Sequence, residues 1–162
     1  MKRNLDQWLA EYNVSHQHPT NIKIHNVCVP FILLSVTGLL TKLFEDILPQ
    51  GIPLLSGGNL FLFVLMVFYG FQDRRLPRVM APLLFLCAVV VTWLSRTQLS
   101  RNHPTIFTLI FAVIFILAWI LQFIGHRIEG RGPSFLTDIR FLFIGPVWVM
   151  VHLRRRWGDR DI

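Results

Sequence analysis

Charged side chains are scarce in this sequence. Asp, Glu, Lys and Arg together make up 15% of the 162 residues, while 53% of the residues are hydrophobic. An average soluble domain carries about a quarter charged residues. The apolar residues here also come in long runs rather than at the spacing of an amphipathic element. This composition excludes an ordinary soluble domain and predicts an integral membrane protein.

Cysteines and the common catalytic motifs are scarce as well. The two cysteines, Cys28 and Cys87, both lie inside apolar runs and neither has a CxxC partner, which argues against a disulfide framework or a thiolate metal site. The sequence contains no P-loop, GxSxG, HExxH or dinucleotide-binding glycine string. The polar stretch 1–23 also lacks the short apolar core of a cleavable signal peptide.

Acidic residues are outnumbered by basic ones, nine to 16, which gives a formal charge of +7. The cations lie between and after the apolar runs rather than on one amphipathic face. They form three groups: Lys2 and Arg3; Arg74, Arg75 and Arg78; and Arg154, Arg155 and Arg156. Cations at these places usually set membrane orientation. We therefore expect the lipid bilayer, and not nucleic acid, as the partner of this charge.

Four apolar runs predict transmembrane helices near the required length of about 20 residues. They cover residues 26–44, 59–71, 79–94 and 105–125. A fifth run, 139–153, is interrupted by Pro146 and fits a short span, a re-entrant segment or an interfacial helix. We predict an all-α, polytopic membrane helical bundle that forms one domain over residues 1–162. Its parts are an interfacial amphipathic helix and loop at 1–20, the bundle at 21–153 and a basic tail at 154–162.

The polar N-terminal stretch contains a short amphipathic helix. Its apolar residues recur at the spacing of one helix face: Leu5, Trp8, Leu9 and Tyr12. Asn4 is a suitable cap, and the aromatic side chains suit the lipid–water interface. Pro19 then breaks the chain, and Thr20 or Asn21 can cap the helix that enters the first span.

The distribution of charge predicts the orientation of the bundle. Lys23 precedes the first span, and Glu45 and Asp46 follow it, which favours a cytoplasmic N-terminus. Four crossings return the chain to the cytoplasmic side, where Arg127 and Arg131 follow the fourth span. Four polar residues then reach the same face: His16, His25, His126 and Glu129. We expect the bacterial inner membrane, or the endoplasmic-reticulum membrane if the protein is eukaryotic.

Histidine at the mouth of a membrane span costs free energy unless it is paired or bound. His16 and His25 would point to opposite sides of one continuous helix, but the break at Pro19 lets both turn toward one point. On the fourth helix, polar residues follow at i, i+4 and i+7: Gln122, His126 and Glu129. Gly130 can end that helix. These strings together predict one metal site assembled from both ends of the chain.

A histidine considered alone is more often an interface residue or a core hydrogen bonder than a ligand. His18 is expected to be solvated or to contact a metal-binding residue without binding the metal itself. His103 is expected to be a loop residue. The role of His152 stays open because the path of the last apolar run is not set by the sequence.

The two polar strings resemble a known family. They read Tyr12-x3-His16-x2-Pro19-x-Asn21-x3-His25 and Trp119-x2-Gln122-Phe-x-Gly125-His126, with Pro30 near the start of the first span. This pattern is similar to the fungal endoplasmic-reticulum 2-hydroxy fatty acid dioxygenase and its bacterial relatives. Further matches follow downstream at Gly132-Pro133-Ser134, Asp138 and Gly145-Pro146, while the middle spans match only in hydrophobicity.

The resemblance implies an iron(II)-dependent dioxygenase that uses O2 to shorten a 2-hydroxy fatty acid by one carbon, without an organic cofactor. The family's iron-binding histidines map onto His16, His25 and His126. Ferrous iron accepts imidazole and carboxylate ligands, and three protein ligands with a chelating 2-hydroxy acid leave one octahedral position for O2. Glu129 lies one step closer to His126 than the family's acidic residue, so it is expected to orient a ligand or to act as a displaceable fourth. Gln122 and Asn21 are expected to contact the metal-binding side chains without binding the metal themselves.

Two other functions fit the same residues. The ligands suit a zinc-dependent membrane lipid hydrolase, and histidines at the interface also suit a non-enzymatic membrane scaffold or transporter subunit. In the dioxygenase, the apolar surface of the spans would hold the acyl chain. The sequence leaves open the preferred chain length, the choice between iron and zinc, and the oligomeric state.

Overall fold

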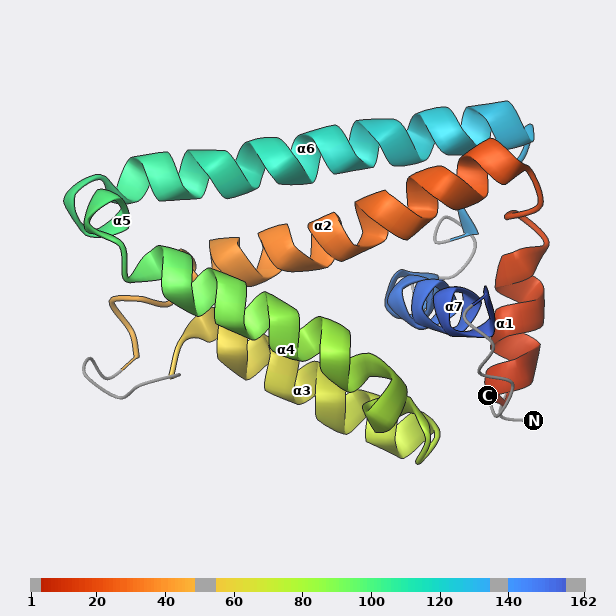
Figure 1. The fold of residues 1–162 in the computed structure, drawn as a ribbon, viewed down its shortest axis with the longest axis horizontal. Helices are drawn as coiled ribbons and strands as arrows, with labels where there is room; N and C mark the ends of the chain where they lie inside the picture. Colours follow the sequence, from red (N-terminus) through yellow and green to blue (C-terminus); the bar gives the residue numbers. More distant parts are fainter. Residues whose placement is uncertain (1–3, 49–54, 135–139, 157–162) are drawn as a thin grey trace.

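A computed structural model describes residues 4–48, 55–134 and 140–156 of the chain, and all regular elements within these ranges are helices (Figure 1). The helices are α1 (Leu5–Asn13), α2 (Pro19–Leu43), α3 (Gly57–Gln72), α4 (Leu76–Ser95), α5 (Gln98–Asn102), α6 (Pro104–Glu129) and α7 (Phe141–Arg156). The all-α prediction is thus confirmed for the described residues. The predictions at Lys2, Arg3, Asp138 and residue 139, and those for residues 157–162, lie outside them.

Three helices, α2, α4 and α6, are long and apolar enough to cross a membrane, while α3 is apolar but has 16 residues. The expected fourth crossing is therefore not established by length. α6 is the least covered of the three. Its outward side chains are 52–57% exposed at Leu109, Val113, Ile116 and Leu117. An apolar surface of this extent marks contact with lipid or another apolar partner.

α2 and α6 lie side by side and antiparallel along the molecule (Figure 1). Two glycines allow the close contact. A Cβ at Gly38 would lie 2.5 Å from the Phe111 ring, and a Cβ at Gly125 would overlap the side-chain oxygen of Asn21. Because the helices are antiparallel, the start of α2 and the end of α6 meet at one end of the bundle. This end carries both polar strings.

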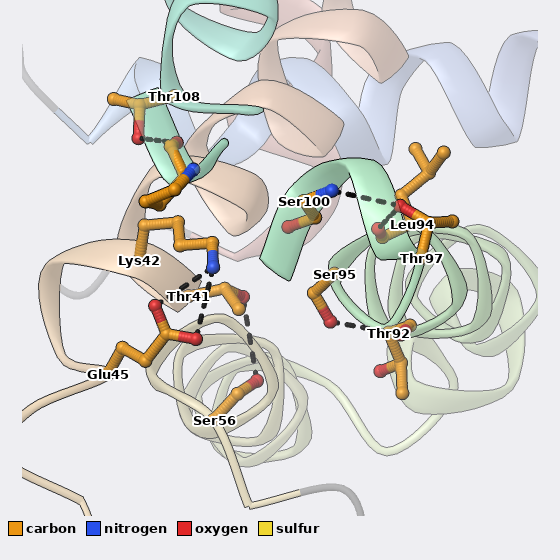
Figure 2. A network of polar contacts seen from close by, with 11 residues as sticks. Thr41, Lys42, Glu45, Ser56, Thr92, Leu94, Ser95, Thr97, Ser100 and Thr108 are labelled. Carbon is orange, nitrogen blue, oxygen red and sulfur yellow. Dashed lines mark hydrogen bonds and ion pairs between the residues drawn. The ribbon is translucent and has the colours of Figure 1, made fainter. Parts of the chain in front are cut away.

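At the opposite end of the bundle, α5 packs on α6 and lies beside the end of α4. Figure 2 shows its polar contacts, which include the ion pair of Lys42 with Glu45 at 2.9 Å. Residues 96–104, which connect the third and fourth apolar runs, contain the short helix α5. Thr97 starts it, because its hydroxyl accepts a hydrogen bond from the Ser100 amide at 3.3 Å.

The helix α1 forms as expected, with Asn4 and Gln7 in a reciprocal capping box. Its aromatic residues, however, do not face the interface. Trp8 and Tyr12 are only 7% and 6% exposed, and the Trp8 ring lies 5.1 Å from the ring of Phe141. The expectation of interfacial aromatics was wrong, because α7 supplies an apolar surface that covers them.

α7 runs across the bundle and is seen end on in Figure 1, whereas α2 and α6 lie along the picture. Its inner residues Val147 and Val149 are 0% exposed, and the Tyr69 hydroxyl of α3 donates to the Phe143 carbonyl at 3.0 Å. The helix continues through residues 154–156, which the sequence assigned to a basic tail. Cations are favourable at this place because they lie at a helix C-terminus.

Candidate metal centre

Three histidines converge where the start of α2 meets the end of α6. His16 comes from the connection between α1 and α2, His25 from α2, and His126 from the last turn of α6. The ring centroids lie 4.3 Å (His16–His25), 4.9 Å (His25–His126) and 5.0 Å (His16–His126) apart. Their candidate ligand atoms all lie within 4.8 Å of one another. One ion bound at about 2.1 Å from each nitrogen bridges such a group after a small closure of the rings.

The break at Pro19 allows this convergence. α1 ends at Asn13, and α2 begins at Pro19 with His18 as its cap, whose Nδ1 accepts from the Thr20 amide at 3.2 Å. The expected cap at Thr20 or Asn21 was wrong, because proline is favoured at the first helical position, where its missing N–H is not needed. At the other side Gly130 ends α6 with φ 71°, as predicted.

Backbone carbonyls fix the orientation of two rings. The Nδ1 of His16 lies 2.6 Å from the Tyr12 carbonyl oxygen, and the Nδ1 of His25 lies 3.0 Å from that of Asn21. Since a carbonyl only accepts, both Nδ1 atoms donate, and each Nε2 keeps its lone pair. Outward N–H donation of this kind is typical of metal-binding histidines.

Two buried ring nitrogens lack a hydrogen-bond partner within the described ranges: Nε2 of His16 and Nδ1 of His126. Such an atom costs free energy when it is left unsatisfied. The three rings are 1–5% exposed, so water does not reach them freely. Neutral imidazoles with free lone pairs and no solvent are the donor set that a transition-metal ion prefers. The residues present therefore fit a metal ion.

The pKa of the His16 imidazole is lowered to about 4, mainly by burial and in smaller part by the nearby His126. The hydrogen bond to the Tyr12 carbonyl and the charge of Glu129 act in the opposite direction. The first effect is the largest because a buried imidazolium loses its hydration. His16 is therefore neutral at pH 7, which is the form that binds metal.

Glu129 lies beside the centre but faces the chain that carries His16. Its carboxylate accepts from the amides of Gln17 and His18, at 2.9 and 2.8 Å, and from the Asn21 side chain at 3.2 Å. It does not belong to the group of atoms that can share one ion. Glu129 thus fixes residues 17 and 18 to the end of α6.

Two further residues support His16 that the sequence did not single out for this role. The Tyr12 ring stacks on the His16 ring, with centroids 4.0 Å apart and planes 7° apart. Arg131, expected mainly as an orientation signal, donates to the Val14 carbonyl at 3.0 Å. The four-residue spacing of Tyr12 and His16 was the only available signal. The contact of Arg131 depends on the tertiary fold.

Of the other residues singled out from the sequence, some lie beside the three histidines and some lie away from them. Gln122 is 5% exposed beside His25 and His126, and its side chain makes no hydrogen bond to any described residue. The Asn21 amide donates to the Ser15 carbonyl at 3.1 Å as well as to Glu129. The other histidines lie apart from the cluster. His18 is exposed, His103 lies between α5 and α6, and His152 stacks on Trp148 at 5.2 Å.

A cavity of about 290 Å³ extends from the histidines into the bundle. Tyr12, Gln122 and Ser134 line it beside His25 and His126, Tyr69 and Trp119 add a hydroxyl and an indole N–H, and the other lining residues of α2, α3, α6 and α7 are apolar. Concave, largely apolar spaces with a few convergent polar groups are typical of ligand sites. The centre is therefore connected to a space for an apolar molecule.

Replacing Gly125 by alanine is expected to separate α2 from α6 at the centre. The new Cβ would overlap the side-chain oxygen of Asn21, so the protein should lose about 1–3 kcal/mol of stability. Thermal unfolding in detergent measures the loss. Gly132→Ala is the matched control, since a Cβ there meets nothing within 4 Å. Equal unfolding temperatures for both variants would contradict the close contact.

Comparison with known proteins places this arrangement in a family. The profile of the family described as 2-hydroxy-palmitic acid dioxygenase Mpo1-like matches residues 2–157. A protein of Saccharomyces cerevisiae named 2-hydroxy-palmitic acid dioxygenase MPO1 is 25% identical over 159 residues, which cover 96% of this chain and 82% of the yeast protein. No solved structure matches. Since the profile covers nearly the whole chain and all three histidines, this protein belongs to the Mpo1-like family.

Proposed function

We propose that this protein is an iron(II)-dependent dioxygenase that converts a 2-hydroxy fatty acid into the fatty acid one carbon shorter. The observation that carries the proposal is the group of three buried histidines with converging ring nitrogens. It occurs in a chain that is similar along its length to a 2-hydroxy-palmitic acid dioxygenase. The open cavity beside the histidines gives an apolar substrate access to them.

The electron count of the reaction fits this site. Oxidation of a 2-hydroxy acid to the shorter acid, CO2 and water removes four electrons, and the reduction of one O2 to the level of water takes up four. No separate reductant or organic cofactor is then required. Iron held by His16, His25 and His126 would supply O2 activation and a chelation point for the hydroxyl and carboxylate of the substrate.

The protein's own groups would hold the substrate and exclude water. The Gln122 amide faces the cavity next to two of the histidines, where it can donate to the substrate carboxylate. The stacked Tyr12 ring and the carbonyls behind His16 and His25 keep the imidazoles in one orientation. The apolar walls of the cavity remove water from the reacting carbon and limit side reactions.

A zinc hydrolase is less well supported by the same residues. Metal-assisted hydrolysis usually needs a carboxylate or another base beside the metal-bound water. Among the described residues that line the cavity there is no Asp or Glu. Glu129, the nearest candidate, has its oxygens occupied by three N–H donors. We therefore favour the dioxygenase.

We further propose four membrane crossings, with α3 as the fourth. α2 leads away from the metal centre and α6 leads back to it, and α4 ends beside α5 at the far end. The chain must then return along α3, whose 16 residues span about 24 Å of a hydrocarbon core about 30 Å thick. α7 would lie in the membrane plane beneath the centre, on the cytoplasmic face of a bacterial inner membrane.

The test is O2 consumption by the purified protein after anaerobic loading with iron(II). We expect one O2 consumed for each 2-hydroxy acid, with the acid one carbon shorter as product, and no turnover by the metal-free or zinc-loaded protein. Metal analysis of the protein as purified should show about one ion per chain. Failure with every chain length would exclude this substrate class, and O2-independent turnover with zinc would favour the hydrolase.

A further inference from the structure

The cavity beside the metal centre is elongated along two helices. On α2 its lining residues run from His25 to Val36, and on α6 from Phe115 to His126, eleven steps along the helix in each case. At 1.5 Å per residue this is about 16 Å along the helix axes. Because the two helices are antiparallel, both histidines mark one end of the cavity, and Val36 and Phe115 mark the other.

Beyond the far end of the cavity, α2 and α6 are in close contact. One turn beyond Phe115, the Phe111 ring packs on Gly38, where a Cβ would lie only 2.5 Å away. Phe111 is 2% exposed, so its ring is enclosed by its neighbours at this position. Phe61, near the start of α3, also lines the cavity. A molecule that enters the cavity from the histidine end therefore meets the Phe111 ring beyond Val36 and Phe115.

The chemistry of the walls specifies the occupant. Beyond the polar groups at the histidine end, the described lining side chains are aliphatic or aromatic, and none is charged. An apolar space of about 16 Å along the helices accepts an extended alkyl chain of roughly a dozen methylenes, given C–C bonds of about 1.5 Å.

We propose that this cavity inside the bundle, and not the lipid-facing surface of the spans, holds the acyl chain. We also propose that Val36, Phe61 and Phe111 set the longest chain accepted. This inference rests on the proposed dioxygenase function for the head group, since the 2-hydroxy acid must reach the histidines. The expectation from sequence placed the chain on the apolar surface of the spans, without separating the outer surface from the inner one. The distance from the metal to the Phe111 ring then limits the length of the substrate.

The first experiment measures kcat/KM for a series of saturated 2-hydroxy acids of increasing length. For the wild type, kcat/KM should rise by up to about fourfold for each methylene that leaves water, and then fall once the cavity is full. Val36→Phe should shorten the best chain by roughly two or three methylenes, because the added ring atoms occupy that length. Phe111→Ala should lengthen it.

Matched controls use the same substitutions on outward faces. Val27 on α2 is 56% exposed and Phe63 on α3 is 65% exposed, so Val27→Phe and Phe63→Ala should leave the chain-length profile unchanged. The proposal is overturned if Val36→Phe and Val27→Phe give the same profile. It is also overturned if kcat/KM shows no upper length limit.

The second experiment does not depend on turnover. A 2-hydroxy fatty acid with a diazirine at its terminal carbon is bound anaerobically to the iron-loaded protein, irradiated, and mapped by mass spectrometry. We expect label on residues near Val36, Phe61 and Phe115, competed by excess unlabelled acid. Label on outward residues such as Phe63, or label without competition, overturns the cavity proposal. If the label lies in the cavity while no acid consumes O2, the dioxygenase function fails and the binding site stands.

Discussion

His126→Ala is expected to remove the bound metal and to lower O2 consumption by more than about 100-fold. Changes to residues that only support metal ligands cost about 10–100-fold in affinity or activity, so loss of a ligand should exceed this range. His126 also comes from α6, whereas the other two proposed ligands come from the N-terminal part of the chain. Its loss therefore leaves a site with donors from one side only. Metal content per chain and O2 uptake are the measurements.

The control for this change is His103→Ala. His103 is exposed and lies between α5 and α6 at the opposite end of the bundle, so metal content and activity should stay at wild-type values. His16→Ala and His25→Ala should resemble His126→Ala, and the double variants should be no worse than the single ones, because the three residues act as a unit. Retention of the metal by any of the three single variants would remove that histidine from the ligand set.

The helices of this fold were largely predictable, because long apolar runs and capping residues are local signals. Asn4, Gly130 and the break at Pro19 mark helix boundaries that the structure contains. The packing of α1 on α7 was not predictable in this way. Trp8 suits both a lipid interface and a protein core, and only the position of α7 decides between them.

The candidate site was predictable in part for a similar reason. Helical spacing and the positive-inside rule brought His16, His25 and His126 to one end of the bundle, and the structure places them there. The direction of each ring was not predictable, because the Tyr12 and Asn21 carbonyls decide it. The interior cavity was also missed, since hydropathy does not separate a wall that faces lipid from a wall that faces a space inside the bundle.

Glu129→Ala is expected to weaken metal binding by about 10–100-fold without removing a ligand. Its carboxylate holds the amides of Gln17 and His18 and the side chain of Asn21, so its loss frees the segment that carries His16. Hydrogen bonds to a charged acceptor contribute about 1.5–3 kcal/mol each, although water replaces part of this at a half-buried site. Titration of the metal-free protein with iron(II) measures the affinity, and thermal unfolding measures the loss of stability.

Glu129→Gln separates the positioning role from a ligand role. The amide keeps one acceptor oxygen for the Gln17 or His18 amide, so we expect iron affinity to recover to within about tenfold of the wild type. Glu45→Ala removes a carboxylate at the opposite end, where Glu45 pairs with Lys42, and should leave metal affinity unchanged. If Glu129→Gln loses the metal as completely as His126→Ala, the carboxylate itself binds the ion, and the three histidines are only part of the ligand set. If Glu129→Ala binds iron as the wild type does, the position of His16 is fixed by the Tyr12 stack and Arg131 alone.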